Sequence, residues 1–67
     1  MNDNIPNAPI WFTTEECAAY LSMPTETLLH WRKNAKGPPH HKFGRSVRYS
    51  KADVDAWTET CRRGKTA

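Results

Sequence analysis

Two breaks that contain proline divide this 67-residue chain into short segments, and they constrain its fold more than any other feature. The first break is Ser22-Met23-Pro24, which ends any helix before it because a proline disfavours helical geometry in the preceding residue. The second is Lys36-Gly37-Pro38-Pro39, which ends a helix and starts an extended segment. A chain of this size buries only about 60% of its unfolded surface, so we expect its segments to share one compact core.

The segment before the first break has a strong start signal for a helix. Thr13-Thr14-Glu15-Glu16 is a capping box, in which the first and last side chains each accept a hydrogen bond from the other residue's backbone N–H. Cys17 or Ala18 pairs with Leu21 at the i, i+3 or i, i+4 spacing of an apolar helix face. We therefore expect a short helix that ends at the first break.

A second helix is predicted over residues 25–34, directly after the first break. Leu28 and Trp31 lie on one face at i, i+3 and form its apolar side. Three polar side chains share another face at i, i+4 and i+7, namely Glu26, His30 and Lys33. Two short helices joined by a three-residue turn are a candidate helix-turn-helix.

A β-hairpin is predicted after the second break. His41–Phe43 and Val47–Tyr49 have the composition of short strands, and Gly44-Arg45-Ser46 between them is a turn that begins with glycine. A two-stranded hairpin is not stable alone, so some of its apolar side chains must pack on the helices; these are Phe43, Val47 and Tyr49. Three basic side chains of the hairpin have no such packing role, namely Lys42, Arg45 and Arg48.

The last segment begins with a second capping box, Ser50-Lys51-Ala52-Asp53, and we expect a third helix there. Three residues at i, i+3 and i+7 form a core-facing stripe, namely Val54, Trp57 and Cys61. Arg62 and Arg63 suit the negative end of this helix, and Gly64 is expected to end it. The predicted order is helix, helix, two-stranded hairpin and helix, which is a small α+β fold.

The net charge of +3 hides a strong asymmetry along the chain. Residues 1–31 contain no Lys or Arg, whereas residues 32–51 contain seven basic residues and no acid. The seven are Arg32, Lys33, Lys36, Lys42, Arg45, Arg48 and Lys51. A short charge run is usually a solvated face, but a surface that repels itself this strongly usually has an anionic partner.

In their joint order and spacing, these segments resemble the winged helix-turn-helix proteins of the excisionase and AlpA-like families, relatives of the MerR DNA-binding domain. The resemblance covers residues 11 to about 61. The matching pieces are Thr13–Ala18 with Leu21, Thr27-Leu28, Trp31-Arg32, Gly37-Pro38-Pro39, Gly44–Tyr49 and Asp53–Trp57. In these families the second helix enters the major groove of DNA, and the hairpin is a wing against the DNA backbone or minor groove. A Ser or Thr cap usually stands where this chain has Pro24, so either Met23 caps the second helix or Thr25 starts it.

The resemblance implies two sets of DNA-binding residues. The recognition-helix set is Thr25, Glu26, Thr27, His30 and Lys33, and the wing set is Lys42, Arg45, Ser46 and Arg48. Glu26 either stabilises the positive end of the helix dipole or accepts from cytosine N4 in the major groove. Arg48 either contacts DNA or pairs with Asp53 or Asp55, in a surface contact worth about 0–1 kcal/mol. Arg45, at a glycine turn, is expected to enter a narrow minor groove.

Residue spacing gives little support to catalysis or metal binding. His40, His41 and Tyr49 could form a nuclease site, but adjacent strand residues point to opposite faces, which separates the two histidines. Cys17 and Cys61 lack the paired ligand spacing of a zinc site, so we expect both thiols in the core. We therefore predict no catalytic residue, no metal and no cofactor.

These observations predict a small DNA-binding and DNA-bending protein of the excisionase kind, that is, a recombination directionality factor. The resemblance implies that it binds double-stranded DNA and helps an integrase to excise a prophage rather than insert it. An AlpA-like transcriptional regulator has the same domain, and the sequence does not separate these two functions. A protein-interaction adaptor with a basic face is an alternative from another class.

We expect one DNA-binding domain over residues 10–62, between flexible tails at 1–9 and 63–67. Residues 1–9 are polar, contain two prolines and show no periodicity. No segment has the length of a membrane span and the start lacks the features of a signal peptide, so we expect a soluble cytoplasmic protein. The last helix ends in polar residues, which favours a monomer in free solution that adds head to tail and cooperatively on adjacent DNA sites.

Overall fold

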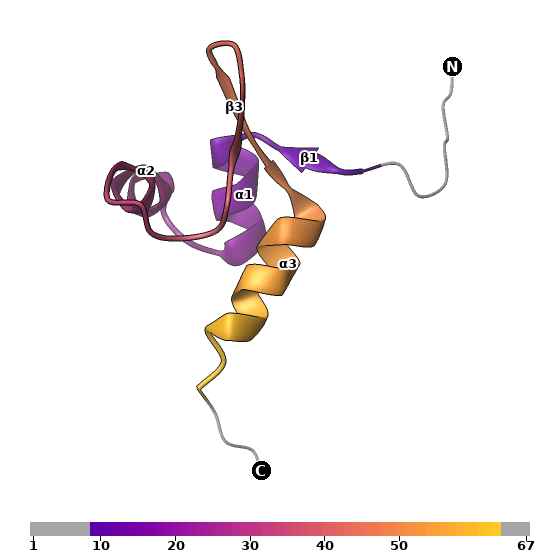
Figure 1. Cartoon of the computed structure of the whole chain (residues 1–67). Coiled ribbons are helices and arrows are strands. Elements are labelled where there is room, and N and C mark those ends of the chain that lie inside the picture. Colours follow the sequence, from indigo (N-terminus) through magenta and orange to yellow (C-terminus); the bar gives the residue numbers. More distant parts are fainter. Residues whose placement is uncertain (1–8, 64–67) are drawn as a thin grey trace.

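The computed structural model describes residues 9–63, which form three helices and a three-stranded antiparallel sheet (Figure 1). The elements follow one another as β1 (Trp11–Phe12), α1 (Thr14–Leu21), α2 (Thr25–Lys33), β2 (His41–Phe43), β3 (Ser46–Ser50) and α3 (Lys51–Thr60). This is a small α+β fold of the winged helix-turn-helix kind, as predicted. Residues 1–8 and 64–67 lie outside the described part of the chain, and with them most of the predicted tails. The expected helix stop at Gly64 is wrong, because α3 already ends at Thr60.

The two helices of the helix-turn-helix begin for local reasons. At α1 the capping box forms completely: the N–H of Glu16 donates to Thr13 Oγ1 at 3.0 Å, and the N–H of Thr13 donates to Glu16 Oε1 at 2.9 Å. Ser22 ends α1 in the left-handed conformation, with a φ of 57°. Pro24 precedes α2 without a side-chain hydrogen bond, so the later of the two expected starts, Thr25, is correct.

The sheet has one strand more than the sequence predicts. β3 lies between β1 and β2, so the expected two-stranded wing gains a third strand at its base. Trp11 of β1 pairs with Ser50 of β3, and Phe12 pairs with Tyr49. A strand of two residues has no alternation pattern, and its partner β3 lies far along the chain, so no local sequence pattern predicts β1.

The wing turn is shorter than predicted. Phe43 pairs with Ser46, so Ser46 belongs to β3 and the turn is Gly44-Arg45 alone. Gly44 has a φ of 66°, which supplies the left-handed conformation that a two-residue hairpin turn requires. Arg45 therefore stands at the tip of the wing, the reddish loop at the top of Figure 1.

The core lies between the sheet and the helices. Its five buried residues are Cys17, Ala18, Leu28, Tyr49 and Val54, and the partly buried side chains against them are Phe12, Leu21, Trp31 and Val47. The ring centroids of Trp31 and Trp57 lie 5.5 Å apart, which joins α2 to α3. The expectation that some wing side chains pack on the helices is confirmed by Tyr49 and Val47, whereas Phe43 is 53% exposed.

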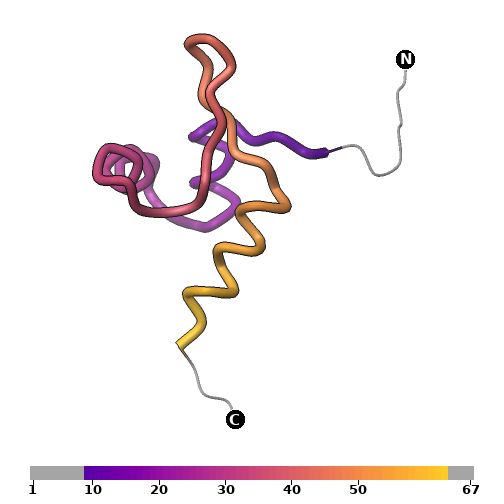
Figure 2. Tube along the Cα trace, viewed as in Figure 1, coloured from indigo at the N-terminus to yellow at the C-terminus, as the bar shows by residue number. Residues whose placement is uncertain are grey.

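The end of α3 corrects the prediction for Cys61. α3 ends at Thr60 and Cys61 follows as an exposed cap residue, so its expected core position is wrong, whereas Cys17 is buried. Figure 2 shows that the last turn of α3 extends beyond the sheet and the other two helices, and Cys61 follows that turn. Arg62 pairs with Glu59 one turn earlier, at 3.6 Å.

Candidate nucleic-acid interface

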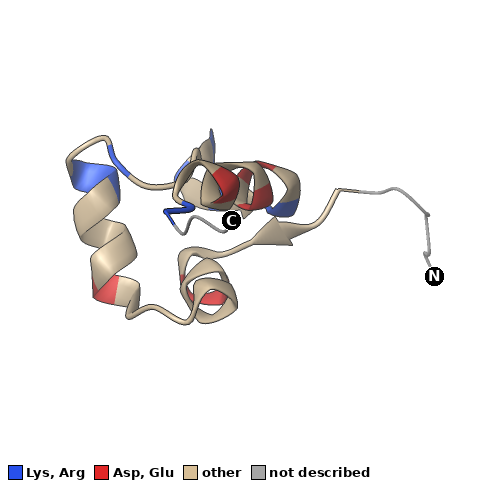
Figure 3. Cartoon of the chain, turned by 90° about the horizontal axis from the view of Figure 1, so that it is seen from below, with Lys and Arg blue, Asp and Glu red and all other residues tan. Residues whose placement is uncertain are grey.

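The outer face of α2 carries most of the predicted recognition-helix residues. Glu26, His30 and Lys33 are exposed, whereas Thr25 and Thr27 are partly buried beside the core. In Figure 3, α2 begins with an acidic residue and ends with basic residues. This order is favourable at both ends of the helix dipole, which is positive at the N-terminus and negative at the C-terminus. The face at i, i+4 and i+7 is thus free to meet a ligand.

The end of α2 positions His30. Asn34 Nδ2 donates to the carbonyl oxygen of His30 at 2.8 Å and lies 3.3 Å from His30 Nε2. The imidazole remains exposed, so its other nitrogen is open to a hydrogen-bond partner.

Leu29 is a residue of this face that the sequence analysis missed. Its side chain is 44% exposed, and it lies one helical turn from both Glu26 and Lys33. The one available signal was that Leu29 falls outside the stripe of Leu28 and Trp31. An exposed leucine among charged groups is an apolar contact point on an otherwise polar face.

The wing residues are exposed at the tip and partly buried toward the base. Lys42, Arg45 and Ser46 are exposed, and Arg48 is partly buried. Arg48 Nη1 donates to the carbonyl oxygen of Val47 at 2.8 Å, which leaves the rest of its guanidinium available.

The two acids expected as possible partners of Arg48 bind other groups. Asp53 lies 3.2 Å from His41 Nε2, and Asp55 Oδ2 accepts from Lys51 Nζ at 2.8 Å. Arg48 therefore forms no ion pair with Asp53 or Asp55, which was the alternative to a DNA contact.

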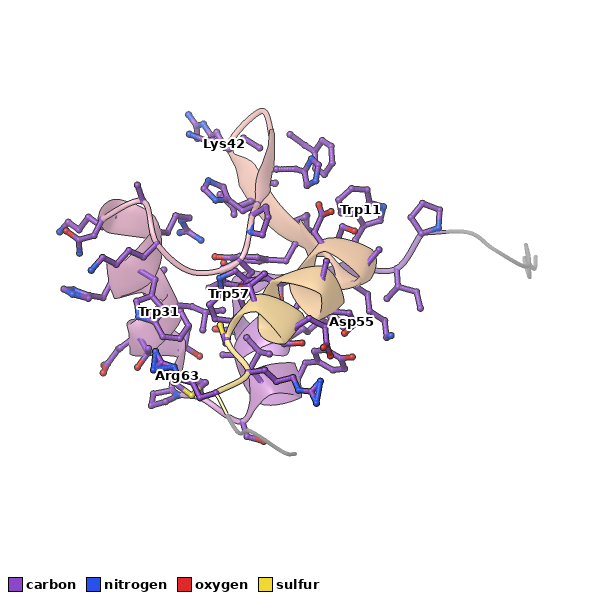
Figure 4. The ribbon with its side chains drawn as sticks, turned by 60° about the horizontal axis from the view of Figure 1, so that its bottom comes forward. Trp11, Trp31, Lys42, Asp55, Trp57 and Arg63 are labelled. Carbon is purple, nitrogen blue, oxygen red and sulfur yellow. The ribbon has the colours of Figure 1, made fainter. Side chains whose placement is uncertain are left out.

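The two sides of the wing differ in chemistry. On one side the Trp11 ring lies 5.0 Å from the His41 ring and 5.3 Å from the Phe43 ring. Lys42, which pairs with Val47, lies on the other side of the wing, the side on which α2 lies (Figure 4). The basic side of the wing and the helix-turn-helix thus face each other.

An open groove of about 390 Å³ lies between α2, the beginning of α1 and the wing. Four of its lining residues belong to the predicted DNA-binding sets, namely Thr25, Arg45, Ser46 and Arg48. The fold therefore brings part of the recognition-helix set and most of the wing set to one groove, while Glu26, His30 and Lys33 lie on the neighbouring face of α2.

Arg32 also lines this groove, although neither predicted DNA-binding set includes it. Its Nη1 donates to Thr14 Oγ1 at 3.0 Å and to Tyr49 Oη at 3.3 Å. These contacts join α2 to the start of α1 and to β3 across separations of 18 and 17 residues, so no local pattern could show them.

His40 lies near the basic side of the wing. Partial burial, followed by the charge of Arg32, lowers the pKa of His40 below its ordinary value of 6.5. Its ring lies 6.0 Å from that of Tyr49, whereas His41 lies on the aromatic side, so the two histidines do not converge. Within residues 9–63, no three His, Cys, Asp or Glu side chains are grouped closely enough to hold a metal ion.

A family model described as a helix-turn-helix domain matches residues 11–62 of the chain. The match runs from β1 to the residues just after α3 and so includes both helices of the motif and the wing. No curated protein is similar enough to the chain to count as a match. No helix of the described residues is long and apolar enough to cross a membrane.

Proposed function

Because the chain belongs to the helix-turn-helix domain family, whose members bind DNA, we propose that α2 enters the major groove of double-stranded DNA while the wing meets the adjacent backbone or minor groove. The observation that carries this proposal is the groove shared by α2 and the basic side of the wing. Residues from both predicted sets flank it, so one duplex could touch both at once.

Base recognition is proposed for the exposed face of α2. Glu26 would accept a hydrogen bond from cytosine N4, and His30 would bond a base edge or a phosphate. Leu29 adds an apolar side chain suited to a thymine methyl group. Lys33 and Thr25 would bond phosphates or groove edges, and the partly buried Thr27 would position the helix.

The wing is proposed to supply affinity more than specificity. Lys42, Arg45 and Arg48 bring positive charge to the backbone or the minor groove, where little sequence information is available. Ser46 lines the groove together with Arg45 and Arg48 and can donate to a phosphate oxygen.

Within DNA binding, the proposed role is that of an excisionase, which bends DNA so that an integrase excises a prophage. The exposed acid at Glu26 fits this role, because in the excisionases that the sequence resembles an acid at this place faces the major groove. An AlpA-like regulator has the same domain and stays the alternative. On this proposal the protein acts in the cytoplasm of the host cell, on the DNA of a prophage and together with an integrase.

Site selection from random duplexes tests base recognition. We expect the parent protein to select a defined site, and Glu26→Ala and His30→Ala each to relax the preference at one position and to cost about 1–3 kcal/mol. Glu59→Ala, an exposed acid of α3, is the matched control and should select the parent site. If both α2 variants select the parent site too, base recognition lies elsewhere, in DNA shape.

The biological role needs a different experiment. Footprinting on the DNA beside the protein's own gene, with a circular-permutation assay for bending, should show adjacent protected sites and a bend. Stimulated excision by a cognate integrase would support the excisionase role. Protection confined to a promoter, with no effect on recombination, would favour the regulator, and the absence of salt-sensitive DNA binding would favour a protein adaptor.

A further inference from the structure

We propose that the groove between α1, α2 and the wing is a seat for one backbone phosphate of the bound DNA, with Arg32 and Arg48 as its principal ligands. This inference rests on the proposed DNA binding and deepens it, because it assigns a contact to a residue outside both predicted sets. The groove is lined by three guanidinium groups, those of Arg32, Arg45 and Arg48.

The two hydrogen bonds of Arg32 fix its guanidinium group and leave the other N–H donors of that group able to bind an anion. Both use Nη1, one to Thr14 Oγ1 at 3.0 Å and one to Tyr49 Oη at 3.3 Å. Within residues 9–63, Nε and Nη2 make no hydrogen bond, so three N–H donors of this partly buried guanidinium remain. A guanidinium already held in place loses less side-chain entropy when it binds a phosphate, and its planar fork matches two phosphate oxygens.

The hydroxyl groups of the groove add neutral donors. Thr14 Oγ1 accepts from Arg32, so its own hydrogen is free to donate, and Thr25 and Ser46 line the same groove. Glu15 is the one acid in the lining, and it is exposed. Three cations and several hydroxyls against one exposed acid favour a tetrahedral anion.

The position of the groove identifies the source of that anion. It lies between the two elements proposed to contact DNA, α2 and the wing. A strand that passes from the major groove at α2 to the wing must cross it, and consecutive phosphates along a strand bring one of them to the seat. The ligand is therefore a phosphodiester of the duplex.

The test combines protein variants with single methylphosphonate linkages, each of which removes the charge of one phosphate. The probe is the duplex that the parent protein selects, modified at one linkage at a time. We expect one linkage near α2 to cost the parent protein about tenfold in affinity. Arg48→Gln and Arg32→Gln should each bind the unmodified duplex about tenfold more weakly than the parent protein does. Modification of that one linkage should not weaken their binding further, whereas modification of the other linkages should affect them as it affects the parent.

Three further measurements separate a contact from a structural effect. Arg32→Gln also removes the bonds to Thr14 and Tyr49, so its thermal unfolding is recorded, whereas Arg48→Gln breaks only a bond to the neighbouring Val47. Arg62→Gln removes the same charge from the end of α3 and should keep the parent's sensitivity at every linkage. Glu15→Gln should strengthen binding, because it removes the acid from the groove.

Opposite results overturn the proposal. If folded Arg32→Gln and Arg48→Gln keep the parent's full sensitivity at every linkage, the groove holds no phosphate, although DNA binding itself stands. If the parent protein binds no duplex at all, the proposed function fails and the seat fails with it.

Discussion

At the scale of single residues, Gly37 has both a backbone conformation and a neighbour that exclude a side chain. Its φ is +82°, and an added Cβ would lie 2.9 Å from Trp31 Cε3. We expect Gly37→Ala to lower the free energy of unfolding by about 2–4 kcal/mol, since left-handed strain adds to overpacking against the ring. Urea unfolding followed by Trp fluorescence measures this loss.

Gly44→Ala is the matched control for this prediction. Gly44 has a φ of +66° but no atom within 4 Å of an added Cβ, so only the backbone strain of about 1–2 kcal/mol applies. Equal losses for the two variants would show that Trp31 moves aside and that its packing on Gly37 contributes nothing.

The two cysteines should differ in reactivity because their surroundings differ. Burial raises the pKa of the Cys17 thiol to about 11, whereas Cys61 is exposed. We expect a thiol reagent at pH 8 to modify one cysteine per native chain and both in urea, as mass spectrometry can count. Cys61→Ser should then show no native modification; rapid native labelling of that variant would contradict the buried position of Cys17.

The raised pKa of Cys17 also has a consequence for stability. Because the folded state favours the protonated thiol, its contribution is fully present below the unfolded thiol's pKa of 9.0 and is lost as pH rises toward about 11.

At the scale of elements, the wing should act through its charge. Arg45 stands at the exposed tip of the hairpin, where no packing depends on it. We expect Arg45→Ala to weaken specific and non-specific DNA binding together and to lower the slope of log affinity against log salt by about 1. Mobility shifts over a range of salt concentrations measure both effects.

A charge control accompanies this measurement. Arg62→Ala removes one cation from the end of α3, where Arg62 pairs with Glu59. It should leave the salt slope nearly unchanged. An unchanged affinity of Arg45→Ala at moderate salt would show that the wing tip does not touch DNA.

At the scale of the whole molecule, we expect a monomer in free solution that assembles on DNA. One domain of this size neutralises about 4–6 phosphates, which gives a salt slope of about −4 to −5 and modest affinity. Selecting a genomic site needs roughly 10³-fold or more discrimination, so neighbouring protomers should bind cooperatively, head to tail. Ultracentrifugation without DNA and titration onto one, two and three sites test this.

The structure is compatible with such assembly but supports only small contacts. The large exposed apolar side chains among residues 9–63 are spread over several elements, with Ile10, Trp11 and Phe43 at β1 and the wing, Tyr20 on α1, Met23 between α1 and α2, and Leu29 on α2. A stable free dimer would contradict this prediction, and so would independent binding at every site with no gain from a neighbour.

The three helices were predictable because their signals are local. The capping box of Thr13 and Glu16 spans three residues, and it forms as expected. Pro24 sets the start of α2, and Gly44 sets the turn of the wing. At the proposed site, the exposed positions of Glu26, His30 and Lys33 follow from helical periodicity alone.

Contacts between distant segments were not predictable in this way. β1 forms only because Trp11 and Phe12 pair with β3. Cys61 is exposed because it follows the last turn of α3, which extends beyond the other elements. Arg32 belongs to the groove through its bonds to Thr14 and Tyr49, which lie in two other elements. Caps, turns and periodicity act within a few residues, so the sequence by itself determined the elements and the exposed face of α2. Which side chains line the groove depends on how the elements pack against one another, and only the tertiary structure decided that.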